Sequence, residues 1–175
     1  MAAEVISARG VRVDLYDSMR SLGRKFLMAG KSGLNITHSE PFEQFVSRYG
    51  KRRAQIEPML RRFGPEQLRQ WVHELGIETF VGTSGRVFPA GMKASPLLRA
   101  WLKRLTDSDV TFHLRHKWSG WTSNKWLRFE SPDGENTTQA DAVVLALGGG
   151  SWSRLGSDGA WIPWLEQAGA HVEPL

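Results

Sequence analysis

Asp17 is the first residue in the chain that could take part in chemistry, because it closes a segment, residues 11–17, in which apolar and polar residues alternate. Alternation predicts a strand, and the helical pattern of residues 1–9, closed by Gly10, predicts a helix before it. In dinucleotide-binding folds an acid at the end of the second strand holds ribose hydroxyls, about 20 residues beyond the glycines that cradle the pyrophosphate. Counting back from Asp17 by that distance falls just before Met1. We therefore expect the Gly-x-Gly-x-x-Gly turn and the first strand to lie upstream of this sequence.

A short basic segment, Gly23-Arg24-Lys25, follows this strand. Its cations could offset phosphate charge or contact the adenosine half of a cofactor. An exposed basic loop without a ligand explains the same residues, so both interpretations stay open at this point.

The next segment is rich in glycine: Gly30 and Gly33 flank a Lys-Ser pair, and Asn35 and Thr37 follow. It lacks the four-residue spacer between glycines and the preceding apolar strand of a P-loop, which excludes an ATP site of that type. We expect the backbone of this segment to come close to a ligand instead.

A third glycine-rich region begins at Gly148 and Gly149 and includes Asp158 in a Gly-Ser-Asp-Gly stretch. It follows residues 140–147, an almost unbroken apolar run that predicts a strand covered on both faces of a parallel sheet. Ligands of open α/β sheets bind at the carboxyl ends of strands, where glycines permit close approach. The alternative is a connecting loop without a ligand.

The elements that must position these residues alternate between helices and strands. We predict loop structure for residues 18–39 and helices over 41–49, 55–63, 65–75, 96–105 and 161–168. We predict strands over 78–83, 110–118 and 125–130, the last two beginning a β-meander that extends over about 110–147. The whole chain, 1–175, is expected to be one partial domain, with residues 41–76 as an inserted helical segment.

Composition limits the alternatives. The 175 residues carry 41% hydrophobic residues, a net charge of +5 and no cysteine, which excludes disulfides, thiolate zinc sites and Cys-x-x-Cys redox pairs. No apolar run reaches the roughly 18 residues of a membrane span, so we expect no membrane association. The lack of cysteine fits a reducing compartment, and we expect a cytoplasmic protein. The five histidines form no cluster of metal-binding type, and His113 and His116 on one strand are expected to face opposite sides. No metal and no catalytic residue are assigned.

Three ordered motifs carry a resemblance to a known family. They read LGRKFLMAGKSGLNITHSE, TSGRVFPAGMKASPLLRAWL and ADAVVLALGGGSWSRLGSDG. Together they resemble the HI0933-like family of FAD-dependent flavoproteins over nearly the full length of the chain. The resemblance implies an α/β, Rossmann-like FAD-binding domain, three-layered, with a mostly parallel sheet and a β-meander. Family members are about twice as long, so the chain is expected to be an incomplete piece, inactive by itself, that lacks the first strand and the glycine-rich turn.

The resemblance implies an oxidoreductase in which FAD takes hydride from NAD(P)H and passes it to an unknown acceptor. His38 lies near the implied cofactor loop. The usual Gly-Arg-Cys-Asn of the family reads Gly33-Leu34-Asn35 here, which leaves the chemistry of that loop unassigned. The cofactor contacts carried over are Asp17, Gly23, Arg24, Lys25, Gly30, Gly33, Asn35, Thr37, Gly148, Gly149 and Asp158.

Two other hypotheses remain. Cations and tryptophans alternate between residues 115 and 128, as in proteins that bind single-stranded nucleic acid. We favour a hairpin whose tryptophans are packed, and do not expect a nucleic-acid partner. The other hypothesis is a non-catalytic remnant that oligomerises through the sheet edge left open by the missing strand.

Overall fold

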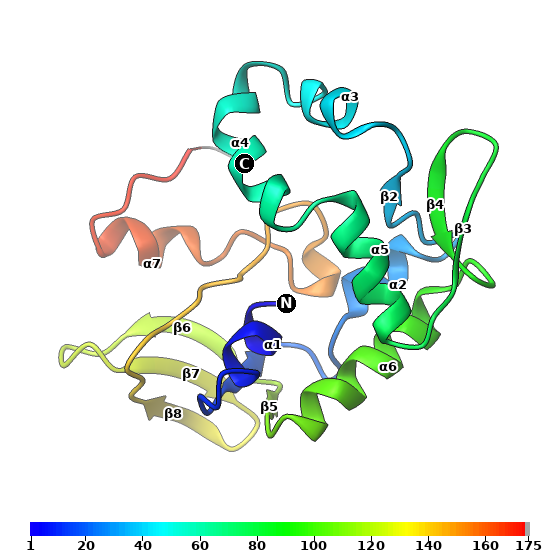
Figure 1. Cartoon of the computed structure of the whole chain (residues 1–175). Coiled ribbons are helices and arrows are strands. Elements are labelled where there is room, and N and C mark those ends of the chain that lie inside the picture. Colours follow the sequence, from blue (N-terminus) through cyan, green and yellow to red (C-terminus); the bar gives the residue numbers. More distant parts are fainter. Residues whose placement is uncertain (174–175) are drawn as a thin grey trace. The chain divides into compact units, whose positions relative to one another are not determined.

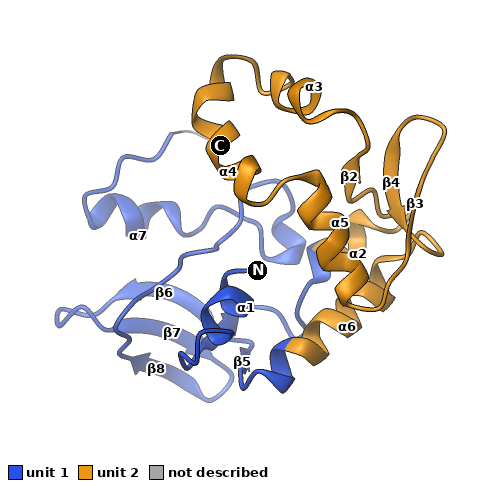
Figure 2. Ribbon diagram, viewed as in Figure 1, with its two compact units in different colours: residues 1–25, 105–175 blue, residues 26–104 orange. Residues whose placement is uncertain are grey.

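The computed structural model describes residues 1–173 as two compact units, and each is described by itself. Unit 1 comprises residues 1–25 and 105–175, of which the last two lie outside the described part, and unit 2 comprises residues 26–104 (Figure 2). Both units contain helices and strands, which confirms the predicted α/β class (Figure 1). None of the helices in the described part has the length and apolar character needed to cross a membrane.

Unit 1 begins with helix α1 (Ala2–Ser7), which ends before Gly10 in a left-handed conformation, and continues into strand β1 (Asp14–Asp17). Strand β1 pairs in parallel with β5 (Thr111–Leu114), with Asp17 opposite Leu114. This two-stranded sheet is the parallel part of the described structure, and the helix–strand order before it is the one predicted from the sequence.

A three-stranded antiparallel meander follows in unit 1. It consists of β6 (Lys117–Trp121), β7 (Leu127–Ser131) and β8 (Gly134–Thr138). The single strand predicted over 110–118 is wrong, because Arg115 adopts a left-handed conformation that ends β5 and sends the chain into a second sheet. Strand β8 was not predicted, since its sequence is polar and its residues are largely exposed.

The core of unit 1 is aromatic. Trp118, Leu127 and Phe129 of the meander are at most 9% exposed. The partly buried residues packed against them are Tyr16, Trp121, Leu147, Trp161, Trp164 and Leu165. The last three belong to or adjoin helix α7 (Ile162–Gln167), near the predicted position.

The strand predicted over residues 140–147 is absent from the structure. These residues belong to no helix or strand, and residues 140–146 are exposed. Val143, Val144 and Leu145 expose 45%, 62% and 38% of their surface. The prediction assumed neighbouring strands and covering helices, and no described strand pairs with the segment.

Unit 2 holds most of the helices. Helix α2 (Arg24–Ala29) begins in unit 1, and is followed by α3 (Phe42–Ser47), the 3₁₀ turn η1 (Gly50–Arg52), α4 (Arg53–Arg62) and α5 (Pro65–Glu74). Most of α6 (Ala94–Asp107) also lies in unit 2. The core consists of Leu34, Val72, Ala94 and Leu97, which are at most 5% exposed.

A small antiparallel sheet completes unit 2. Its order is β2 (Thr37–His38), β4 (Arg86–Pro89) and β3 (Thr79–Val81). The loop predicted over residues 18–39 is therefore wrong in part, since it contains both α2 and β2. The short strand β2 forms because β4 pairs with it, Thr37 opposite Val87 and His38 opposite Arg86. The segment that forms β4 was not predicted to be a strand.

Candidate functional site

The side chain of Lys25, the second residue of α2, reaches the glycine-rich loop that begins at Gly148. Its ammonium Nζ donates hydrogen bonds to Ser151 Oγ at 3.0 Å and to Ser157 Oγ at 3.1 Å. Ser157 is 4% exposed and Ser151 is exposed. One cation and two hydroxyls thus meet at a partly open place in unit 1.

Gly148 lies directly against this group of side chains. Its φ is +74°, and a Cβ built on it would lie 2.7 Å from Ser157 Oγ. Its carbonyl oxygen accepts a hydrogen bond from Trp161 Nε1 at 3.0 Å, which anchors the loop to the aromatic core. Only glycine therefore fits this position without strain, because it tolerates left-handed φ and leaves the hydroxyl in place.

Asp17 lies at the carboxyl end of β1, as predicted. One carboxylate oxygen, Oδ1, accepts a hydrogen bond from the Met19 amide at 2.8 Å, so the side chain folds over the start of the following loop. Gly156 approaches the same loop, since a Cβ on it would lie 3.1 Å from Ser18 Oγ and 3.3 Å from Met19 Sδ. The loops after β1 and after residue 147 are therefore in contact within unit 1.

Unit 1 holds seven of the eleven predicted contact residues. Gly23 has a φ of +69° and precedes Arg24, the first residue of α2. Asp158 Oδ1 accepts a hydrogen bond from the Ala160 amide at 3.0 Å, so this carboxylate stabilises the local turn. The structure brings two of the seven, Lys25 and Gly148, to one place through Ser157, and that place adjoins the end of β1.

The other four predicted residues lie in unit 2, where Gly30 has a packing role. A Cβ on Gly30 would lie 2.5 Å from Ala94 Cβ, so glycine permits the end of α2 to contact α6. Gly33 has a φ of +136° and lies against Met92. Thr37 pairs with Val87 in the small sheet.

Asn35 differs from these three. It is exposed, and no described residue hydrogen-bonds to its side chain. Its amide group is therefore available to a ligand, whereas Gly30, Gly33 and Thr37 are accounted for by the packing and pairing of unit 2.

The two serines are the residues that sequence reasoning left out of the site. Both lie in the glycine-rich region that the sequence singled out, but nothing in the sequence pairs them with a lysine 126 and 132 positions away. The signal that could have found them is that serine hydroxyls are common donors to phosphate oxygens.

The donor set matches the groups of a dinucleotide. An ammonium and two hydroxyls beside a glycine that admits no side chain suit phosphate oxygens. A carboxylate at the end of β1 suits ribose hydroxyls. The residues of unit 1 could therefore hold phosphate oxygens at the Lys25 group and ribose hydroxyls at Asp17.

His113 and His116 of unit 1 belong to one aromatic cluster, which corrects the prediction that they face opposite sides. Tyr16 stacks on His113 at a centroid distance of 4.3 Å and on Phe129 at 4.1 Å, and the two histidine rings lie 5.7 Å apart. The left-handed conformation of Arg115 turns the chain between them. His113 Nε2 also lies 2.8 Å from Asp14 Oδ1. No group of three or more potential metal ligands occurs in the described residues.

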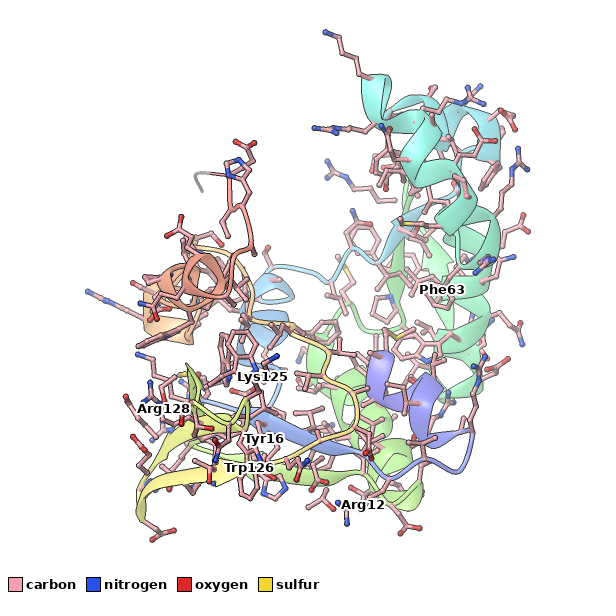
Figure 3. All side chains as sticks on the ribbon, turned by 90° about the vertical axis from the view of Figure 1, so that its left-hand side faces the viewer. Arg12, Tyr16, Phe63, Lys125, Trp126 and Arg128 are labelled. Atoms are coloured by element: carbon pink, nitrogen blue, oxygen red, sulfur yellow. The ribbon has the colours of Figure 1, made fainter. Side chains whose placement is uncertain are left out.

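The tryptophans of the β6–β7 hairpin pack within unit 1. Trp118 and Trp121 contact each other edge to face at 4.7 Å, and both belong to or pack against the core. Arg128 donates to the Ser119 carbonyl oxygen at 2.8 Å and lies over Trp164 at 5.6 Å. Among the hairpin tryptophans Trp126, labelled in Figure 3, is the exposed one at 43%. These contacts account for the positions of Trp118, Trp121 and Arg128, whereas Trp126 remains exposed.

Comparison with known proteins gives the family. The model of the HI0933-like protein Rossmann domain matches residues 1–175. The chain belongs to this family. The match confirms the Rossmann-type fold class and the resemblance read from the three motifs, and it identifies the chain as a member of an FAD-binding, oxidoreductase-type family. No curated protein matches the chain.

Proposed function

We propose that this HI0933-like protein binds FAD and acts as an oxidoreductase. In this reaction hydride passes from NAD(P)H through the flavin to an organic acceptor. The observation that carries the proposal is the group formed by Lys25, Ser151 and Ser157 beside Gly148. A lone surface lysine would carry little weight, but this lysine is held by two hydroxyls of a glycine-rich loop.

Different residues of unit 1 would contact different parts of the cofactor. Lys25 neutralises diphosphate charge, and the two serine hydroxyls donate to phosphate oxygens. Gly148 lets the backbone approach those oxygens, and Asp17 accepts hydrogen bonds from ribose hydroxyls through the oxygen that the Met19 amide leaves free. The bound flavin supplies the redox chemistry, and the protein supplies its position and surroundings.

Asn35 in unit 2 is a further candidate contact. It rests on the family resemblance and on the exposure of its side chain. Gly30, Gly33 and Thr37 are proposed only as supports that shape the segment carrying Asn35, since each has a packing or pairing partner.

The hydride step is tested by anaerobic mixing. Protein saturated with FAD is mixed with NADH or with NADPH, and the visible absorption band of the flavin is followed. The proposal expects one of the two donors to bleach the band faster than it bleaches free FAD. Equal rates for bound and free FAD with both donors would refute the hydride donor while leaving cofactor binding to be judged by its own titration.

A further inference from the structure

Trp152 is an exposed aromatic side chain in the loop that carries the two serines of the Lys25 group. It follows Ser151 directly in the sequence and exposes 40% of its surface. Among the described residues, its ring stacks on no other ring and its indole nitrogen donates no hydrogen bond. A large flat apolar surface therefore stands beside the group to which phosphate binding is assigned.

The other tryptophans have different surroundings. Trp71 and Trp101 of unit 2 contact each other edge to face at 5.0 Å. Trp126 is 43% exposed, but it lies in the turn between β6 and β7. Four more belong to or pack against the aromatic core of unit 1: Trp118, Trp121, Trp161 and Trp164. Trp152 is thus the tryptophan that the glycine-rich loop leaves exposed.

The backbone places the Trp152 side chain on the face of the loop that carries Ser157. The amide of each of these two residues donates to the carbonyl oxygen of the other at 3.1 Å, which forms an antiparallel bridge. Directly opposed residues in such a pair project to the same face, with Cβ atoms about 5 Å apart. Since Ser157 Oγ accepts a hydrogen bond from Lys25 Nζ, the indole and the ammonium lie on one side of the loop.

The same loop also contacts the segment that begins at Asp17. A Cβ on Gly156 would lie 3.1 Å from Ser18 Oγ, and Asp17 Oδ1 is held by the Met19 amide. In dinucleotide-binding folds the ribose bound by an acid at this position is that of adenosine. The base attached to that ribose is adenine, so adenine is the ring of the cofactor expected nearest to this loop.

We propose that Trp152 is the residue on which the adenine ring of the cofactor stacks. An indole offers a purine a flat apolar surface, and stacking requires no hydrogen-bond donor or acceptor from the side chain. The inference rests on the proposed function, because it takes the phosphates to be held by Lys25. It also assigns part of the affinity to adenosine, so adenosine diphosphate, which lacks the flavin, should bind by itself.

The first test is calorimetric titration of the whole protein with adenosine diphosphate and, separately, with FAD. Trp152→Ala should raise the Kd for both ligands by about fivefold or more. Trp152→Phe should keep the Kd within about twofold of the natural protein, because an aromatic ring is retained. Trp126→Ala is the matched control, because Trp126 is equally exposed and lies in another loop, and it should leave both Kd values unchanged.

Three results of this titration would overturn the proposal. Equal effects of Trp152→Ala and Trp126→Ala would remove the special role of Trp152. A loss in Trp152→Phe as large as in Trp152→Ala would show that the fold of the loop and not the ring is at issue. A loss of FAD affinity without a loss of adenosine diphosphate affinity would exclude adenine as the stacked ring.

The second test is quenching of tryptophan fluorescence by adenosine diphosphate. This ligand does not absorb at the wavelengths of tryptophan emission, so it quenches by contact and not by energy transfer. We expect saturable quenching in the natural protein and in Trp126→Phe, and its loss in Trp152→Phe; quenching that persists in Trp152→Phe would refute the stacking. Lys25-dependent binding of FAD that no Trp152 variant affects would overturn this inference alone, whereas binding of neither ligand would overturn the proposed function as well.

Discussion

Replacing Gly148 by alanine tests the strain on which the loop depends. The left-handed conformation at φ +74° costs a residue with a Cβ about 1–2 kcal/mol. The new Cβ would also meet Ser157 Oγ at 2.7 Å and displace a hydroxyl that accepts from Lys25. A hydrogen bond of this kind contributes about 0.5–1.5 kcal/mol, so the expected loss in free energy of unfolding is about 1.5–3.5 kcal/mol.

The neighbouring residue provides the control. Gly149 has no left-handed φ, and a Cβ on it would have nothing within 4 Å. Gly149→Ala should therefore change the free energy of unfolding by no more than about 0.5 kcal/mol, or stabilise slightly by restricting the unfolded chain. Urea denaturation followed by tryptophan fluorescence measures both variants. Equal losses for Gly148→Ala and Gly149→Ala would refute the assignment of the strain to Gly148.

Two further variants test the site and the helical unit. Lys25→Met should raise the Kd for FAD by about tenfold, the lower part of the range for a charged hydrogen bond, because Lys25 is exposed. Lys51→Met, on another exposed lysine, in unit 2, should leave the Kd unchanged, and equal effects of the two substitutions would count against a role for Lys25. Hydrogen bonds from Arg53, and then from Arg61, lower the pKa of Glu57. The stabilisation from this carboxylate is therefore present above its unfolded pKa and lost as pH falls through the lower folded pKa. Thermal melting from neutral to acid pH should show a smaller pH-dependent drop for Glu57→Gln than for the natural protein, and identical profiles would show that these pairs contribute nothing.

All described α-helices except α2, which lies within the predicted loop, could be predicted from local sequence because their signals are local. Helix α5 begins with Pro65 in its first turn, and the Gln67 side chain accepts from the Gly64 amide at 3.0 Å. Gly76 follows its end with a φ of +76°. Each feature lies within the helix or one turn of it, so no distant partner is needed.

The strands depended on partners that the sequence does not specify. Residues 140–147 have the composition of a buried strand and form none, because a strand requires a neighbour and the described structure places none beside them. The reverse holds for β8, whose polar residues form a strand because β7 lies beside them. The hydrophobic pattern predicts which segments can form strands. Whether a segment does form a strand depends on the neighbouring strand with which it can pair.

The site could be predicted as residues but not as an arrangement. Lys25 and Gly148 were both expected near a cofactor, each from its own motif. Their connection through Ser157 spans 132 positions, and contacts at that separation follow from the fold and not from spacing. The packing of Gly30 against Ala94 was equally hidden, so a glycine expected to lie near a ligand also has a packing role.

The most direct test of the central claim is a titration of the protein with FAD, followed by flavin fluorescence and the visible absorption band. We expect saturable binding that is weakened by Lys25→Met and by added salt, because an exposed ammonium contributes to holding the diphosphate. Binding that does not saturate would contradict the assignment of the cofactor to the loops around Lys25 and Gly148. Saturable binding whose Kd is unchanged by both the substitution and the salt would contradict it as well.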